Sequence, residues 1–572
     1  MGKRKAAPRA EEEAGGDSTY AQCLADLSHV EPGQRHGACS LLGNIFLANS
    51  SHSAAAVVTR FTTADMLARL HTRLQDSDRN VALEAARAVR NALLSECATE
   101  RLREYGFLST VCALLRSRLV GMLADPQGYD FMDAMLCEQL LLCVINLLTH
   151  SEEGVDVIIS NKMCAPLVNG LLGFSHDALL AMRMLCADAL FTATDGSPAM
   201  CVELSKQPDL VLRLTQLAQQ QHSSSPGALI GLRAAGVLLH LSSLPAGAQA
   251  SSVRPALVDG IAAAADRAQA ALALDSGDDG AEGGVSCEYY SKLSHWYHLD
   301  TLKLSGELLS NLCLEGRAGE RQLPHRLLLL LAASLESVAS FLQRNEPSLK
   351  YEALTASQGC AASLCTAVAS VAGLLDEPRL LPLCPRVLAS AAQLLQVLEE
   401  DAAPLKMALL GALLVLAEQA GGLAAPEQLL QRLCMVVSRD EPAVAALAAE
   451  ALAALAAGSL PAACSEALLA RVEALVSGRS MGGAKARLLA AAAEAYVDLH
   501  SGDGDEALEL YRSAGAGALL ARAAAALPAQ HSDTADTLQE FLRYKQAFID
   551  AAEPRKEEEA TAGRRSRETK RS

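Results

Sequence analysis

The stretch Ala38–Ile45 reads ACSLLGNI, and its pattern of a small residue, several apolar residues and an asparagine recurs along the chain. Further copies are AARAVRNA at Ala85–Ala92, LLCVINL at Leu141–Leu147 and SGELLSNL at Ser305–Leu312. Asn91 follows Asn44 by 47 residues, and Asn146 follows Asn91 by 55. A recurrence of roughly 40 to 47 residues is typical of armadillo and HEAT helical arrays. The sequence therefore predicts an all-α, armadillo/HEAT-type solenoid with a right-handed superhelix.

The composition supports stacked helices. Hydrophobic residues make up 51% of the 572 residues, whereas aromatic residues make up only 3%. Alanine and leucine carry most of the apolar content, which favours close helix packing over a β-sandwich rich in aromatic and β-branched residues. One helical hairpin cannot cover its own apolar surface, so neighbouring repeats stack and share a continuous core. Such an array suits protein binding and has no obvious catalytic cleft.

The charge of the chain limits the classes of partner. A net charge of −17 argues against binding nucleic acid by neutralising its phosphates, and it attracts basic proteins. The charged N-terminus has no apolar segment of the kind that signal peptides carry, and the apolar runs 327–333 and 407–416 are too short to span a bilayer. None of the sixteen cysteines belongs to a CxxC pair, and we interpret them as reduced thiols in the core. We expect a monomer in the cytoplasm and nucleus.

Changes in composition along the chain predict its domain organisation. Charged and small residues at the two ends predict disorder, whereas a Ser/Pro/Gly-containing linker at 220–227 separates two patterns of repeats. The predicted segments are a disordered tail at 1–18, armadillo-like repeats at 19–219, HEAT-like repeats at 220–500 with an acidic insertion at about 272–288, C-terminal capping helices at 501–552 and a disordered basic tail at 553–572.

The recurrent asparagines are the most informative polar residues. They are Asn44, Asn91, Asn146 and Asn311. In one interpretation they line the concave groove, where an amide can hold the backbone of an extended peptide. In the other they cap or bridge neighbouring helices. The sequence leaves both interpretations open.

Two charged segments are further candidates for binding. The insertion carries Asp275, Asp278, Asp279 and Glu282 among glycines, so it is either a docking loop for a basic segment or a tolerated surface insertion. Lys3, Arg4 and Lys5 begin the chain and a second basic cluster ends it. Import receptors recognise short basic clusters on disordered tails, so these two clusters are candidate nuclear-localisation signals. In the alternative interpretation they are tails that only improve solubility.

Motifs for catalysis and metal binding are missing from the sequence. Cys287, Glu288, His295 and His298 stand near one another, but no second ligand pair completes a zinc pattern. The chain has no phosphate-binding glycine loop, GxSxG elbow or HExxH motif. We therefore expect no enzyme activity, no metal and no cofactor.

The basic opening Met1–Lys5, the armadillo half, the HEAT half and the acidic insertion between them together resemble the symportin family, import chaperones of ribosomal proteins. The resemblance implies an adaptor that binds basic large-subunit ribosomal proteins of the 5S particle and escorts them with a nuclear import receptor. It also implies that Asp275–Glu282 engages one ribosomal protein, that the asparagine groove holds a basic peptide and that Lys3–Lys5 recruits the receptor. The insertion is short for this role, and no Pro-Tyr pair accompanies the basic N-terminus.

A scaffold role is the alternative. Acidic armadillo and HEAT proteins also hold structural partners in ciliary, cytoskeletal or signalling assemblies. Binding of a basic cargo should weaken steeply with salt, whereas an apolar scaffold contact should not. Salt dependence therefore separates the two functions.

Overall fold

A computed structural model describes residues 9–547 except 50–54, 126–127, 152, 175–178, 208, 221–224, 243–253, 275–293, 315–322, 346–350, 376, 399–401, 421–422, 424, 457–461, 479–482 and 500–515. Within these ranges every regular element is a helix. The chain divides into two compact units, residues 1–264 with 279–297 and residues 265–278 with 298–572. The prediction of an all-α solenoid of stacked helical repeats is confirmed.

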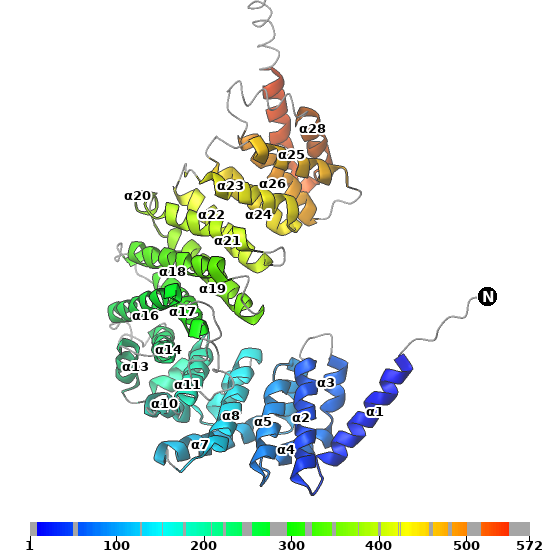
Figure 1. Ribbon diagram of the computed structural model, residues 1–572, viewed down its shortest axis with the longest axis vertical. Helices are drawn as coiled ribbons and strands as arrows, with labels where there is room; N and C mark the ends of the chain where they lie inside the picture. The colour runs from blue at the N-terminus through cyan, green and yellow to red at the C-terminus, as the bar shows by residue number, and fades with distance from the viewer. Residues whose placement is uncertain are drawn as a thin grey trace, which may run out of the picture. The chain divides into compact units, whose positions relative to one another are not determined.

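The first unit is organised around a stack of long helices, which we call the ladder. Each ladder helix packs against the next, as the blue to green ribbons of Figure 1 show. Its members are α2 (Pro32–Ala48), α5 (Arg79–Ala92), α8 (Phe131–His150), α11 (Leu180–Thr194) and α14 (Ser225–Ser242). Because α14 continues this stack, the unit extends beyond residue 219, where the sequence predicts the armadillo half to end.

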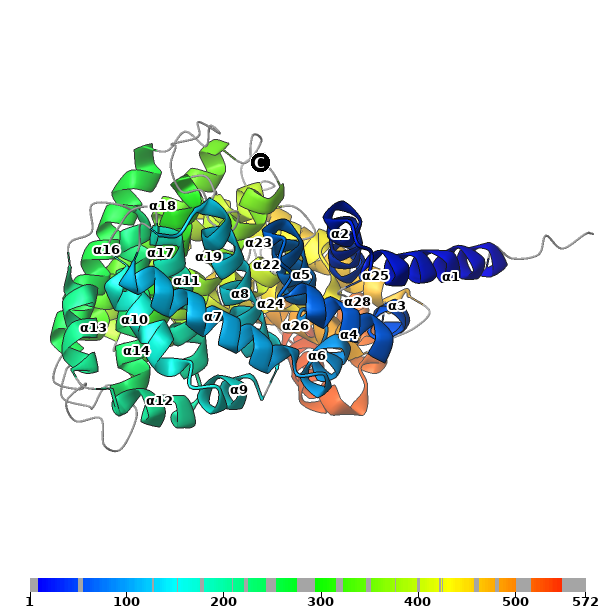
Figure 2. The same cartoon turned by 90° about the horizontal axis from the view of Figure 1, so that it is seen from below.

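A pair of shorter helices precedes each later ladder helix and completes the three-helix repeat of armadillo arrays. Figure 2 shows two helices of this layer, α9 and α12, side by side. The pairs are α3 (Ala55–Phe61) with α4 (Ala64–Arg73), α6 (Glu96–Glu104) with α7 (Phe107–Ala124), α9 (Gly154–Ser160) with α10 (Cys164–Gly173), and α12 (Pro198–Ser205) with α13 (Leu210–Gln219).

Local sequence signals set where these helices begin. The Asp78 carboxylate caps α5 by accepting from the backbone amides of Asn80 and Val81, and Asp130 caps α8 in the same way through the Asp133 amide. Gly106 adopts φ 72° between α6 and α7, a left-handed conformation that glycine tolerates best. These signals turn the chain sharply between helices and allow the repeats to stack.

Helix α1 (Arg9–Asp26) begins earlier than the sequence predicts, inside the range 1–18 that we expected to be disordered. The segment from Ala10 to Ala14 consists of alanine and glutamate, which are strong helix formers. The glutamates also stand near the helix N-terminus, where the helix dipole favours negative charge. Local propensity therefore extends the helix without the apolar periodicity on which the prediction depended.

The second unit is built from two stacked layers of helices, in the two-helix pattern of HEAT arrays. One layer consists of α18 (Leu323–Asn345), α21 (Cys384–Val397), α23 (Glu427–Arg439), α25 (Ala462–Val476) and α28 (Ala516–Ala526). The other consists of α19 (Tyr351–Ala372), α22 (Ala403–Ala420), α24 (Pro442–Leu455) and α26 (Gly483–Leu499). Helices α16 (Arg254–Leu274) and α17 (Ser294–Leu314) each contribute residues to both units. In the second unit α20 (Glu377–Leu380) and η4 (Ala529–His531) are short, and residues 532–547 are helical.

Among the helices that the structure describes, five are long and apolar enough to cross a membrane by length and composition alone. The sequence analysis, which considered only the short apolar runs 327–333 and 407–416, did not identify them. Helix α8 is one of them, and 56% of its most apolar window is buried inside the protein. Helix α8 packs against α5 and α11 in the ladder and against α7 and α9 beside it, so it is apolar over most of its circumference. Packing within the repeats therefore accounts for this burial.

Candidate functional site

Two asparagines on the ladder helices, Asn91 and Asn146, make the same bond to the preceding ladder helix. Asn91 on α5 is buried, with 3% of its surface exposed, and its Nδ2 donates to the Gly43 carbonyl of α2 at 2.9 Å. Its Oδ1 accepts from the Nε of Arg90 at 3.0 Å. The amide therefore bridges two helices, which is the second interpretation left open by the sequence. A buried amide that faces the neighbouring helix is not available to clasp a peptide.

Asn146 repeats this bond one repeat further along. It is half-buried on α8, and its Nδ2 donates to the Arg90 carbonyl of α5 at 2.9 Å. Gly43 and Arg90 each stand immediately before a ladder asparagine, so the two bonds are equivalent. The Nη1 of Arg90 spans the same step and donates to the Oε1 of Gln139 at 2.8 Å. Polar bonds thus connect α2, α5 and α8 in series.

Asn44 lies on α2 and its side chain is exposed. Leu41 and Leu47 stand three residues before and after it and are 38% and 52% exposed. On a helix this spacing places the three side chains on one face. We call Leu41, Asn44 and Leu47 the α2 stripe. It presents an amide between two apolar side chains to solvent.

The remaining predicted site residues are not brought into this arrangement. Asn311 is exposed on α17 in the second unit. The acidic insertion with Asp275, Asp278, Asp279 and Glu282, and the basic tail with Lys3, Arg4 and Lys5, lie outside the described residues. The structure therefore gives no geometry for either of these two candidate segments.

The structure describes only part of the Cys287–His298 cluster, from which the sequence predicts no metal site. Cys287 and Glu288 lie outside the described residues, and His298 is half-buried on α17. No group of three or more metal-ligating side chains occurs in the part of the chain that the structure describes. Every described cysteine except the half-buried Cys97 is buried, as the interpretation as core thiols requires.

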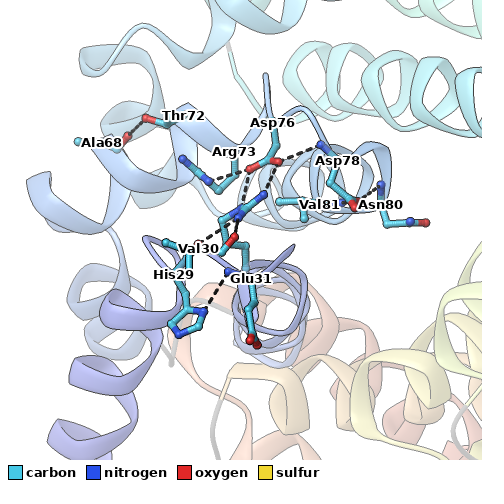
Figure 3. A network of polar contacts seen from close by, with 11 residues as sticks. His29, Val30, Glu31, Ala68, Thr72, Arg73, Asp76, Asp78, Asn80 and Val81 are labelled. Carbon is cyan, nitrogen blue, oxygen red and sulfur yellow. Dashed lines mark hydrogen bonds and ion pairs between the residues drawn. The ribbon is translucent and has the colours of Figure 1, made fainter. Parts of the chain in front are cut away.

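A network of polar contacts around Asp76 holds the first repeat together (Figure 3). The buried Arg35 donates through Nε and Nη2 to both carboxylate oxygens of Asp76 at 2.8 Å, and through Nη1 to the carbonyls of His29 and Val30. Burial by itself raises the pKa of the Asp76 carboxyl, but the bonds from Arg35 and from the Asp78 amide outweigh it and hold that pKa below its ordinary value. The network joins the segments before α2 and before α5, so its role is structural.

Sequence reasoning missed a groove of about 540 Å³ at the edge of the first unit, which we call the edge groove. Its walls come from α6, from the last turn of α8 and from the start of α9. Glu96 and Glu100 on α6 and Glu153 before α9 are exposed along it, and Arg103 forms an ion pair with Glu153. The spacing of Glu96 and Glu100, one helical turn apart, is the only sequence signal of this acidic face.

The described helices form an α-solenoid of stacked helical repeats. No protein-family model and no curated protein matches the sequence. A solved structure described as an engineered protein is 16% identical with a TM-score of 0.43, and the match covers 92% of this chain and 99% of the other. A designed armadillo repeat protein is 14% identical over 50% of this chain and 98% of its own, with a TM-score of 0.33.

A second designed armadillo repeat protein, in complex with the peptide (KR)4, is 15% identical with a TM-score of 0.34. That match covers 51% of this chain and 98% of the other. Because these identities and TM-scores are low, the similarities carry no argument about function, which has to be argued from the residues of this chain.

Proposed function

We propose that this chain is a protein-binding adaptor that holds basic segments of large-subunit ribosomal proteins of the 5S particle and escorts them, with an import receptor, into the nucleus. Stacked helical repeats present long continuous surfaces on which an extended polypeptide can lie. The observation that carries the proposal is the α2 stripe, an exposed amide between two exposed leucines at the end of the ladder, in a chain of net charge −17.

The chemistry of the α2 stripe suits an extended segment. Leu41 and Leu47 offer apolar contact for alternate side chains of a partner, while the Asn44 amide can both donate to and accept from its backbone. Basic residues that flank such a segment gain from the acidic surface of the chain, which also speeds their capture. Ribosomal proteins are rich in such basic segments, and the resemblance to the symportins points to the same cargo.

Titration of the full chain with purified ribosomal proteins of the 5S particle tests this proposal. Binding should weaken steeply between 50 and 300 mM salt, and Asn44→Ala should weaken it by about 1 kcal/mol if the amide bonds to the cargo backbone. Asn311→Ala is a matched control, since Asn311 is equally an exposed helical asparagine but lies in the other unit. Absence of binding at low salt would contradict the proposal.

The α2 stripe also favours the second candidate, a scaffold for a structural partner. Exposed leucines form contacts whose strength depends little on ionic strength, because they involve no charge. Affinity that is lost in Leu41→Ser with Leu47→Ser, yet is unchanged by salt, would identify the scaffold function in place of the chaperone function.

A further inference from the structure

The edge groove is a separate surface from the α2 stripe, and two successive repeats build it. Helix α6 belongs to one repeat and α9 to the next, with the last turn of α8 between them. Its volume of about 540 Å³ falls within the roughly 300 to 1,000 Å³ of typical ligand sites. The groove exists only when both repeats are stacked. A ligand of the groove therefore binds the folded array and not a single isolated helix.

The groove is lined by hydrogen-bond acceptors from two different sources. The first is carboxylate, from Glu96 and Glu100 on one wall and Glu153 on the other. The second is the end of α8, whose last turn lines the groove and whose dipole places partial negative charge there. Ser151 follows α8 with φ −140° and ψ 124°, so the chain leaves without the left-handed turn that commonly closes the final carbonyls.

The chain already places one cation in this groove. Arg103 reaches from α6 to Glu153 at the start of α9, and their side chains remain 44% and 59% exposed. Leu108, which is buried, and Leu148 and Val157, which are half-buried, also line the groove. Apolar and acidic side chains in one groove suit the aliphatic stem and charged head of lysine or arginine. The ion pair of Arg103 with Glu153 is an example of this chemistry within the chain.

We propose that the edge groove binds a lysine or arginine side chain of a basic polypeptide partner. The incoming cation packs its stem on Leu148 and Val157 and shares the Glu96, Glu100 and Glu153 carboxylates with Arg103. This inference rests on the proposed function only in that both invoke a basic partner, because the groove and the α2 stripe have no residue in common.

Binding of a fluorescent octapeptide of alternating lysine and arginine to the full chain, followed by anisotropy at low salt, tests the groove. Replacing Glu96, Glu100 and Glu153 by glutamine should weaken binding about tenfold, since exposed carboxylates each contribute modestly. A control of equal charge, Glu31→Gln with Asp65→Asn and Glu418→Gln, removes three exposed carboxylates outside the groove and should change the affinity less than twofold. Circular dichroism checks that each variant is folded.

Arg103 supplies a test of opposite sign. Arg103→Gln should tighten binding about threefold because it frees the Glu153 carboxylate, while Arg101→Gln, on the same helix but paired with Glu104, should not. Equal affinities of the groove variant and its charge-matched control, or weaker binding by Arg103→Gln, would overturn the inference. Loss of ribosomal-protein binding with intact groove-dependent peptide binding would instead count against the proposed function alone.

Discussion

The Nδ2 of Asn91 lies 2.9 Å from the carbonyl oxygen of Gly43, the residue immediately before Asn44 on the preceding ladder helix. Asn146 makes the same bond to Arg90, the residue immediately before Asn91. The recurrence of asparagine therefore has a cause in the stacking of the repeats: each amide fixes the register of its helix against the one before. Asn44 stands on the first ladder helix, which explains why it alone of these three is exposed.

Asn91→Ala should lower the free energy of unfolding by about 1 to 3 kcal/mol, because the buried bond to Gly43 is lost and the Nε of Arg90 loses its acceptor. Asn44→Ala should change it by less than about 0.5 kcal/mol, because that side chain is exposed. Urea unfolding of the two variants beside the parent measures both values. Equal destabilisation would contradict the bridging role.

Two helical glycines should respond oppositely to alanine. A Cβ at Gly43 would lie 3.5 Å from the Cα of Ala88, an ordinary contact, so Gly43→Ala should be neutral or stabilise by up to about 1 kcal/mol. A Cβ at Gly154 would lie 2.6 Å from the Leu147 carbonyl oxygen, so Gly154→Ala should destabilise by about 1 to 3 kcal/mol. Thermal unfolding of the pair gives the sign of each change.

Asp76 should make the stability of the first unit sensitive to acid. Its folded pKa lies below the unfolded value, so its contribution is fully present above about pH 4 and is lost as the pH falls through the folded pKa. In Asp76→Asn, stability at neutral pH should be lower and its decline below pH 4 should be shallower. Denaturant midpoints measured from pH 2.5 to 7 report both effects, and parallel curves for parent and variant would contradict the prediction.

Lys406 and Asp440 form a buried ion pair at 2.6 Å in the second unit, with side chains only 4% and 6% exposed. Lys406→Ala leaves the carboxylate buried without its cation and should cost about 3 to 5 kcal/mol. Since repeats contact only their neighbours, the loss of hydrogen-exchange protection should concentrate in α22 to α25. If amide hydrogen exchange instead rose evenly across α18 to α28, the second unit would unfold more cooperatively than nearest-neighbour contacts between repeats predict.

Cys97 should react with iodoacetamide before the other described cysteines. It is half-buried, whereas burial raises the pKa of Cys137 and Cys143 to about 12 and keeps them as unreactive thiols. Mass spectrometry of peptides from the native protein after brief treatment gives the order of modification. Early labelling of Cys137 would show that α8 opens far more readily than its packing suggests.

Some of this architecture could be predicted from individual residues. Asp78 and Asp130 are helix caps that act on the amides two or three residues ahead, so a local sequence reports them. The spacing of Asn44, Asn91 and Asn146 likewise predicts stacked repeats. A contact that recurs between successive helices, such as the asparagine bond to the preceding helix, requires the same residue type in each repeat. By contrast, the sequence analysis did not predict that α1 begins at Arg9. The first turns of this helix form through the propensity of alanine and glutamate, and they contain no periodic pattern of apolar residues.

The sequence by itself determined the helical repeats, their apolar faces and the acidic charge, because these depend on residues close together in the chain. The tertiary structure alone decided that Asn91 and Asn146 bridge helices while Asn44 faces solvent, since burial depends on what a neighbouring repeat covers. It also created the edge groove, where Glu100 and Glu153 from different repeats come to one surface. Such a meeting depends on how the repeats stack, which no local pattern encodes.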